Sequence, residues 1–273
     1  MKIIVAKARM SAWSDAAHAQ RKIVAFVPTM GYLHQGHLSL VRLARKLADR
    51  VVVSIYVNPT QFGPREDFKS YPRDLKRDLR LLRSAGVHAV FVPKNMYGNR
   101  PEVQVDPGPI QNVLCGRERP GHFRGVATIV LKFLSVVKPD VAVFGQKDAQ
   151  QFVILNRMVQ ELDLGVKMVA GPVIREKDGL AMSSRNARLS ERERSLAPSL
   201  YRGLLSVRKG FKQGRREALA LLKAAAKIPA GKVEYFTAVD SQTLMPVRTL
   251  RRGTLVAAAM RLGKVRLIDN IIL

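Results

Sequence analysis

Two histidines and two glycines fall within the ten residues Pro28–His37, which read PTMGYLHQGH. His34 and His37 are three residues apart, so both rings can lie on one side of the first turn of a helix. Imidazole N–H groups placed there can donate hydrogen bonds to phosphate oxygens and to charge that develops on them. Gly31 and Gly36 allow a sharp bend and a close approach to a ligand. The pattern indicates a phosphate-binding turn, although two histidines near a turn can also be merely solvated.

Two further segments carry side chains that suit phosphate. Gly145–Asp148 (GQKD) follows an apolar run and precedes a predicted helix, so Lys147 would place a point charge between a strand and a helix. Met182–Arg185 (MSSR) offers two hydroxyl donors and a forked guanidinium. Ser-Ser-Arg is common by chance, and Asp148 suits a helix N-cap without any ligand. Each segment is therefore informative mainly beside the histidine turn.

Side-chain amides follow another strand. The run 51–57 is nearly all β-branched, which is typical of a strand buried on both faces, and Asn58-Pro59-Thr60-Gln61 comes directly after it. Gln150 and Gln151 follow the lysine turn. Polar groups at the carboxyl ends of parallel strands lie where α/β sheets bind ligands. On the pattern alone, an ordinary Asn-Pro turn is an equally good interpretation.

Strands and helices alternate through residue 170. Apolar runs predict strands at 2–5, 23–27, 51–57, 87–93, 141–144 and 166–170, with helical periodicity between them. This order predicts an α/β fold whose first domain, residues 1–175, is a Rossmann-like parallel sheet. Residues 176–273 carry two basic amphipathic helices, at 191–209 and 215–227, and strands at 233–239, 255–261 and 265–272. They predict a smaller α+β C-terminal domain that covers the site.

Several polar side chains outside these motifs are expected to be structural. The stretch 66–85 has an apolar stripe at helical spacing, and its Asp78 could lie near a metal, but we expect a solvated carboxylate on the helix surface. His122, in the basic segment 116–124, is expected to make a structural hydrogen bond, although the arginines there could gather anions. Ser190 with Glu193 predicts a capping box at the start of a helix.

Composition narrows the class of protein. The chain has 273 residues, no apolar run near the ~20 residues of a membrane span, and no signal-peptide pattern. Its one cysteine, Cys115, excludes an internal disulfide, fits a reducing cytoplasm and is expected to be a small buried side chain. The net charge is +26, but the basic residues are scattered and no aromatic stacking motif occurs, so we expect neither specific nucleic-acid binding nor membrane binding.

The strings PTMGYLHQGH, NPTQF, RPGHFRGV, FGQKDAQQ and MSSR together resemble the pantothenate synthetase (pantoate–β-alanine ligase) family, within the HxGH superfamily of adenylyl-transferring enzymes. The resemblance covers almost all of the first domain and the domain junction. It implies a ligase of pantothenate biosynthesis that uses ATP and Mg²⁺, acts in the cytoplasm and forms a homodimer. Pantoate would attack the α-phosphorus of ATP to give pantoyl adenylate and pyrophosphate. β-Alanine would then attack the acyl carbon and release AMP.

The resemblance also implies roles for individual residues. His34 and His37 would stabilise the transition state at the α-phosphorus, with His37 the better candidate proton donor, and Lys147 would contact the triphosphate. Gln61 would hold pantoate and β-alanine, and Gln151 would hold pantoate. No metal ligand is implied. The residues expected to bind ATP are Met30, Gly31, Tyr32, Leu33, His34, Gln35, Gly36, His37, Gly145, Gln146, Lys147, Asp148, Ile174, Met182, Ser183, Ser184 and Arg185.

Two other functions stay open at this point. A nucleotidyltransferase of the same superfamily would keep the nucleotide in its product and would not need the amides at 58–61 and 150–151. A nucleic-acid-binding module is suggested by the charge alone, and steeply salt-dependent binding to duplex DNA would support it. A Walker P-loop is excluded because the chain lacks its glycine-lysine string.

Overall fold

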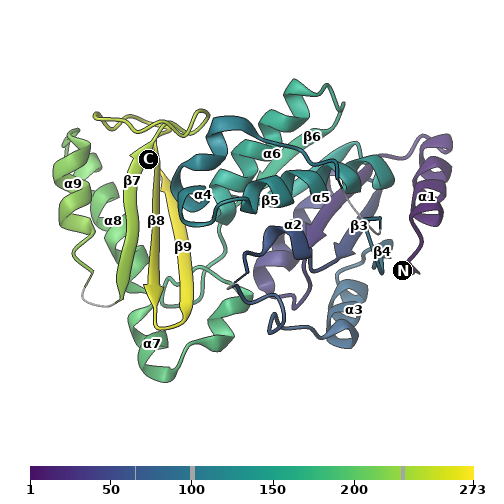
Figure 1. Ribbon diagram of the computed structural model, residues 1–273, viewed down its shortest axis with the longest axis horizontal. Helices are drawn as coiled ribbons and strands as arrows, with labels where there is room; N and C mark the ends of the chain where they lie inside the picture. The colour runs from purple at the N-terminus through teal and green to yellow at the C-terminus, as the bar shows by residue number, and fades with distance from the viewer. Residues whose placement is uncertain (65, 99–101, 229–230) are drawn as a thin grey trace.

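The computed structural model describes residues 1–64, 66–98, 102–228 and 231–273, and its strands form two sheets (Figure 1). The strands of the first sheet are β1 Lys2–Ile4, β2 Val24–Thr29, β3 Arg50–Ile55, β4 Ala89–Phe91, β5 Val141–Gly145 and β6 Lys167–Gly171. They are all parallel, in the order β1-β4-β3-β2-β5-β6. The second sheet is antiparallel and consists of β7 Lys232–Val239, β8 Leu255–Leu262 and β9 Val265–Ile272. The predicted fold class is confirmed.

Helices connect these strands. The α-helices are α1 Lys7–Ala19, α2 Gln35–Leu47, α3 Leu75–Ser84, α4 Leu114–Glu118, α5 His122–Val137, α6 Ala149–Glu161, α7 Glu191–Leu196, α8 Ser199–Lys212 and α9 Ala218–Ala225. Short 3₁₀ turns are η1 Pro59–Gln61, η2 Gly108–Asn112, η3 Gln146–Asp148 and η4 Ser184–Arg188. Across the described residues, none of the helices is both long and apolar enough to cross a membrane.

The parallel sheet is the middle of three layers because its strands are apolar on both faces. In β2, Val24 and Phe26 pack with α1, α5 and α6, whereas Ala25 and Val27 pack on the other side with α2 and α3. This alternation is the period of two expected for a strand. All four side chains are fully buried, so the central strand is held rigidly between the two helical layers.

The strand order reverses beside β2. From β2 the chain adds β3 and β4 on one side, and it later returns to place β5 on the other side of β2. In open α/β sheets the crevice outside the carboxyl ends of the strands at such a reversal is the usual ligand site. Pro28–His37 follows β2, and Gly145–Asp148 follows β5. The topology therefore brings the two predicted phosphate turns next to each other.

The second sheet lies beside the carboxyl edge of the first and is packed against α8 and α9 (Figure 1). Asn270 in β9 donates from Nδ2 to the carbonyl oxygens of Gln146 (2.9 Å) and Lys147 (3.0 Å). Arg175, which follows β6, makes a two-pronged ion pair with the buried Asp269. The C-terminal sheet is thus joined by hydrogen bonds to the lysine turn of the first sheet.

The structure corrects two predicted helices. The stretch 66–85 is helical only from Leu75. Pro72 interrupts it, because a residue that precedes a proline is disfavoured in the α conformation. Asp74 then caps α3 by accepting a hydrogen bond from Arg77 N (2.9 Å). The helix predicted over 191–209 is two helices, α7 and α8, separated at Pro198, which has no N–H to donate. The capping box of Ser190 with Glu193 is confirmed at the start of α7.

Candidate active site

The histidine turn is built by reciprocal hydrogen bonds at the start of α2. His34 is the N-cap, and its Nδ1 accepts from Gly36 N (3.1 Å), while His37 Nδ1 accepts from His34 N (3.3 Å). A Cβ on Gly36 would lie 2.8 Å from the His34 ring, so this cap requires glycine. Since both Nδ1 atoms accept, each neutral ring carries its hydrogen on Nε2. Both histidines line the same cleft.

Burial keeps these two rings uncharged. It lowers the pKa of His34 to about 4, with a further contribution from the charge of Lys147. Burial lowers the pKa of His37 to about 3, and the neighbouring His34 and Lys147 act in the same direction. At neutral pH both rings are therefore neutral hydrogen-bond donors. Neutral rings are suited to act as fixed hydrogen-bond donors, and proton donation by His37 stays a prediction.

Asp78 is not the solvated surface carboxylate that we predicted. It is 1% exposed and accepts hydrogen bonds from the backbone N–H groups of Tyr32 (2.7 Å) and Leu33 (2.8 Å). These bonds span from α3 to the turn, in which Gly31 (φ +81°) and Tyr32 (φ +50°) both have left-handed backbone. The sequence pattern hid this role because Asp78 lies among arginines and lysines on an amphipathic helix. It holds the strained part of the histidine turn in place.

One cleft collects most of the predicted site residues. Its walls come from the ends of β2 and β5, from η1, α5 and α6, and from the segment 172–185. Fourteen of the nineteen predicted residues line it: Met30, His34, Gly36, His37, Gln61, Gly145, Lys147, Asp148, Gln151, Ile174, Met182, Ser183, Ser184 and Arg185. The sequence thus identified segments that the fold brings together over a separation of about 150 residues.

The other five predicted residues do not line the cleft. Gly31, Tyr32 and Leu33 form the turn beneath it, and Leu33 is fully buried. Gln35 is exposed at the start of α2. Gln146 donates from Nε2 to Asn270 Oδ1 (3.3 Å), on the side of the second sheet. Asp148, for which an N-cap was the alternative interpretation, occupies the N-cap position of α6, but its side chain makes no capping hydrogen bond.

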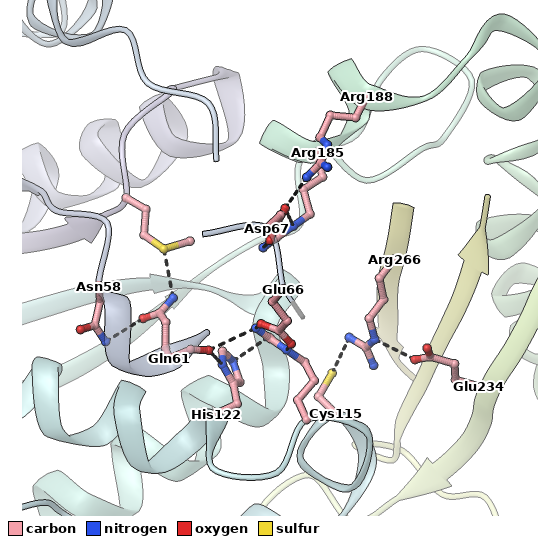
Figure 2. A network of polar contacts seen from close by, with 12 residues as sticks. Asn58, Gln61, Glu66, Asp67, Cys115, His122, Arg185, Arg188, Glu234 and Arg266 are labelled. Carbon is pink, nitrogen blue, oxygen red and sulfur yellow. Dashed lines mark hydrogen bonds and ion pairs between the residues drawn. The ribbon is translucent and has the colours of Figure 1, made fainter. Parts of the chain in front are cut away.

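Both ends of the Gln61 side-chain amide are held by hydrogen bonds (Figure 2). Its Oε1 accepts from Asn58 Nδ2 (3.2 Å), and its Nε2 donates to Met30 Sδ (3.0 Å). Asn58 also donates to the carbonyl of Gly125 in α5 (3.1 Å). A Cβ on Gly125 would lie 2.3 Å from Thr60 O, so α5 can approach η1 this closely only with glycine there.

The basic segment before α5 supports the same turn. Arg119 makes a two-pronged ion pair with Glu66 (2.7 and 2.6 Å) and donates to His122 Nε2 (2.9 Å). His122 must then carry its hydrogen on Nδ1, which donates to Gln61 O (2.8 Å). Burial and the charge of Arg119 lower the pKa of His122 to about 3. The structural hydrogen bond predicted for His122 is confirmed.

An apolar wall completes the cleft, and the sequence analysis missed it. Val126, Ile129, Val130 and Phe133 of α5 line the cleft together with Tyr56. In the sequence these residues look like any buried helical run, because α5 is apolar on most of its surface and the side that faces a cavity cannot be distinguished from the side that faces the sheet.

Cys115 is buried, as predicted, and contacts Tyr235 and Arg266 outside this cleft.

The described residues contain no group of three histidine, cysteine or carboxylate side chains arranged to hold a metal ion. Most of the charged side chains that line the cleft are cationic, namely Lys147, Arg119 and Arg185. The carboxylate of Asp148 also lines it, with Oδ1 3.8 Å from Lys147 Nζ. Such a cleft attracts a polyanion. Neutral imidazole donors, hydroxyls, a lysine and an arginine at the carboxyl edge of a parallel sheet are groups suited to phosphate, and the side-chain amides of Gln61 and Gln151 lie in the same cleft.

Known proteins match the chain along its whole length. The family model described as pantoate-beta-alanine ligase matches residues 2–272. A pantothenate synthetase of Thermosipho melanesiensis is 53% identical over 256 residues, which are 92% of this chain and 91% of that protein. The crystal structure of pantothenate synthetase from Thermus thermophilus superimposes with a TM-score of 0.94 at 42% identity, over 100% of this chain and 99% of that one.

A third relative was crystallised with ligands. It is the pantoate-beta-alanine ligase of Francisella tularensis, in complex with beta-gamma ATP and beta-alanine. Its TM-score is 0.82 at 32% identity, with 100% of this chain and 97% of that chain covered. These matches extend through the second sheet as well as the first. The chain therefore belongs to the pantoate–β-alanine ligase family.

Proposed function

We propose that the cleft holds ATP and pantoate side by side, joins them as pantoyl adenylate, and then passes the acyl group to β-alanine. The overall reaction is that of the family: the chain is a ligase that condenses pantoate with β-alanine at the expense of ATP. The observation that carries the proposed mechanism is the convergence of His34, His37, Lys147 and Gln61 on one cleft. Phosphate-binding groups and amides then face the two substrates of the first step.

The nucleotide would bind along the two turns and the MSSR segment. Lys147 and Arg185 supply positive charge, and the hydroxyl of Ser183 supplies a neutral donor for the triphosphate. Ser184 Oγ gives its one hydrogen to Tyr32 O (3.2 Å), which ties this segment to the histidine turn. The charges of Lys147 and Arg185 would stabilise the pyrophosphate as it leaves.

The histidines would act at the α-phosphorus. Their Nε2–H groups are neutral donors, and their rings stand 4.1 Å apart between centroids, so one phosphoryl group can meet both. Donors fixed before the reaction stabilise the charge of the transition state without reorganising. Pantoate would attack with a carboxylate oxygen, forming the bond to the α-phosphorus while the bond to pyrophosphate breaks. No proton transfer is needed in this step, which suits neutral rings.

Pantoate would lie between the amides and the apolar wall. Gln61 and Gln151 present polar groups to its hydroxyl and carboxylate oxygens, and Val130 and Phe133 offer a surface for its methyl groups. Gln61 would also meet the amine of β-alanine. In its neutral form, that amine attacks the acyl carbon of the adenylate. The nitrogen loses a proton as the amide forms, and AMP leaves from the acyl carbon. We propose no acyl-enzyme, because the cleft residues include no serine or cysteine paired with a histidine base.

We propose that Mg²⁺ enters with the triphosphate. The ion is usually held by substrate phosphates, water and one or two carboxylates rather than by a cage of protein ligands. Asp148, in the wall beside Lys147, is the carboxylate placed to contribute. The charge of the ion would add to that of the lysine in neutralising the phosphates.

Three broader proposals concern the division into domains, the assembly and the compartment. The division into residues 1–175 and 176–273 is supported by the two separate sheets, although the core that contains Phe26 also takes in Leu244 and Leu255. Assembly as a homodimer would be tested by sedimentation equilibrium. Action in the cytoplasm fits a chain with a single buried cysteine.

Isotope exchange tests the order of the chemistry. Labelled pyrophosphate should exchange into ATP when pantoate and Mg²⁺ are present and β-alanine is absent. After the full reaction, oxygen label from the pantoate carboxylate should appear in AMP, since that oxygen becomes bonded to phosphorus. Formation of ADP, or exchange that requires β-alanine, would exclude the adenylate mechanism.

A further inference from the structure

The arginine assigned to the triphosphate already holds a carboxylate. Arg185 donates from Nε to Asp67 Oδ2 and from Nη2 to Asp67 Oδ1, both at 3.0 Å. Arg188 donates from Nη1 to the same carboxylate, at Oδ2 (2.5 Å), so two arginines share one aspartate (Figure 2). The Arg185 guanidinium also lies over the Tyr71 ring, 5.5 Å from its centroid. One carboxylate therefore holds the 3₁₀ turn η4 against the segment that follows η1.

This carboxylate is charged at neutral pH. Burial by itself would raise the pKa of Asp67, but the hydrogen bonds and charge of Arg185 outweigh it and leave the pKa below its usual range. The Asp67 side chain is 16% exposed, so the ion pair is partly shielded from water. The cluster of Asp67, Arg185 and Arg188 carries two positive charges and one negative charge. It is still a cationic site for an incoming phosphate.

A guanidinium offers the same pair of N–H groups to a carboxylate or to a phosphate. In Arg185 the edge formed by Nε and Nη2 is taken by Asp67. A phosphate that used this edge would have to displace the carboxylate. Arg185 and Asp67 both border a larger cavity that adjoins the cleft and shares Lys147, Ser183 and Arg185 with it, so a polyphosphate that extends there meets the pair directly.

We propose that Asp67 is an exchange partner for polyphosphate: it holds Arg185 while the cleft lacks a triphosphate, gives the arginine up to ATP, and takes it back as pyrophosphate leaves. The inference rests on the proposed role of Arg185 in binding the triphosphate. It makes Asp67 a positioning residue that acts through Arg185. The proposal predicts the direction in which Asp67 changes the affinity for polyphosphate. A carboxylate that competes for Arg185 lowers this affinity, whereas a residue that only supports the site would raise it.

The test is Asp67→Asn, which keeps the shape and removes the charge. Isothermal titration with pyrophosphate and with ATP should show binding about three- to tenfold tighter than in the wild type, since the lost competitor is a partly exposed charged pair. Binding of AMP should not change, because AMP lacks the terminal phosphates. Pyrophosphate should become a stronger product inhibitor. Unchanged or weaker pyrophosphate binding by a folded variant would overturn the proposal.

Two matched variants complete the design. Asp106→Asn removes another aspartate–arginine pair, the exposed one with Arg124 (2.7 Å), and should leave pyrophosphate binding unchanged. Arg185→Gln should weaken pyrophosphate binding, and Asp67→Asn added to it should have no further effect. If the tightening persists without Arg185, the exchange idea is wrong. If Arg185→Gln alone has no effect, the proposed role of Arg185 fails, and the inference with it.

Thermal unfolding identifies a variant that does not fold. Should Asp67→Asn lower the melting temperature enough to prevent titration, Asp67→Ser, which also removes the charge, takes its place with the same expected sign. Pyrophosphate binding by that variant that is no tighter than in the wild type would count equally against the proposal.

Discussion

Gly125→Ala should damage pantoate use far more than ATP binding. A methyl group at this position would lie 2.3 Å from Thr60 O and 2.8 Å from Gln61 N, whereas real Cβ atoms essentially never come closer than 3.0 Å to such atoms. The helix α5 and the turn η1 must therefore separate by about 0.7 Å. That shift stretches the hydrogen bond of Asn58 to the Gly125 carbonyl and moves Gln61 within the cleft.

The expected magnitudes separate catalysis from stability. A displacement of about 1 Å can cost about 10²-fold in rate when it misplaces a substrate. Overpacking costs about 1–3 kcal/mol of stability, and replacing glycine by alanine within a helix returns up to about 1 kcal/mol. The free energy of unfolding should thus fall by about 2 kcal/mol or less. The exchange of pyrophosphate into ATP should fall by about 10²-fold at a fixed pantoate concentration.

The assay measures that exchange across a range of pantoate concentrations, together with ATP affinity by titration. Gly98→Ala is the control, since a Cβ there meets no atom within 4 Å among the residues that the structure describes, and the φ of Gly98 lies outside the left-handed region. Loss of ATP affinity equal to the loss of pantoate use would refute the reasoning, and so would a Gly125→Ala enzyme with normal pantoate kinetics.

Three further perturbations test the site. His37→Ala should lower the rate of adenylate formation by about 10²–10³-fold with little change in ATP affinity; a loss below tenfold in single-turnover measurements would contradict its role. The His34 and His37 rings should titrate near pH 4 and 3, respectively, in NMR spectra. Because these pKa values are below the 6.5 of an unfolded chain, the stability that the neutral rings contribute above pH 6.5 should be lost as the pH falls toward these values. A ring that titrates at 6.5 in the folded enzyme would be contrary evidence. Asp78→Asn should cost about 1–3 kcal/mol, since Tyr32 N and Leu33 N donate to different carboxylate oxygens and the amide replaces one of these acceptors by an NH2 donor. A denaturation midpoint equal to that of the wild type would argue against it.

The parts of the site that sequence could predict are those in which residue type and chemistry coincide. Gly36 was predicted to allow a sharp bend, and in the structure its lack of a side chain makes room for the cap by His34. Lys147 was predicted because a lysine in a turn before a helix suits phosphate, and it lines the cleft. The parallel sheet could also be predicted from the sequence, since Val51–Val53 and Val141–Val143 are apolar throughout, and in the structure both segments are buried.

The parts that could not be predicted depend on which face of an element meets which neighbour. Asp78 has the sequence context of a surface residue, yet α3 places its carboxylate under the histidine turn. Phe133 belongs to a helix that is apolar on most of its surface, so its position at the cleft depends on how that helix is rotated. The pairing of Asp67 with Arg185 joins residues 118 positions apart, and no local pattern encodes such a contact.

The hydrogen bonds from Asn270 to the lysine turn bear on how the enzyme comes into being on the ribosome. The carbonyl groups of Gln146 and Lys147 receive their donor from a residue more than 120 positions later in the chain. A nascent chain can complete the parallel sheet long before β9 has been synthesised, but the turn that carries Lys147 lacks its support until then. The turn that carries Lys147 therefore gains these two hydrogen bonds only after β9 has been synthesised, and a chain that stalls before β9 would carry the parallel sheet without them.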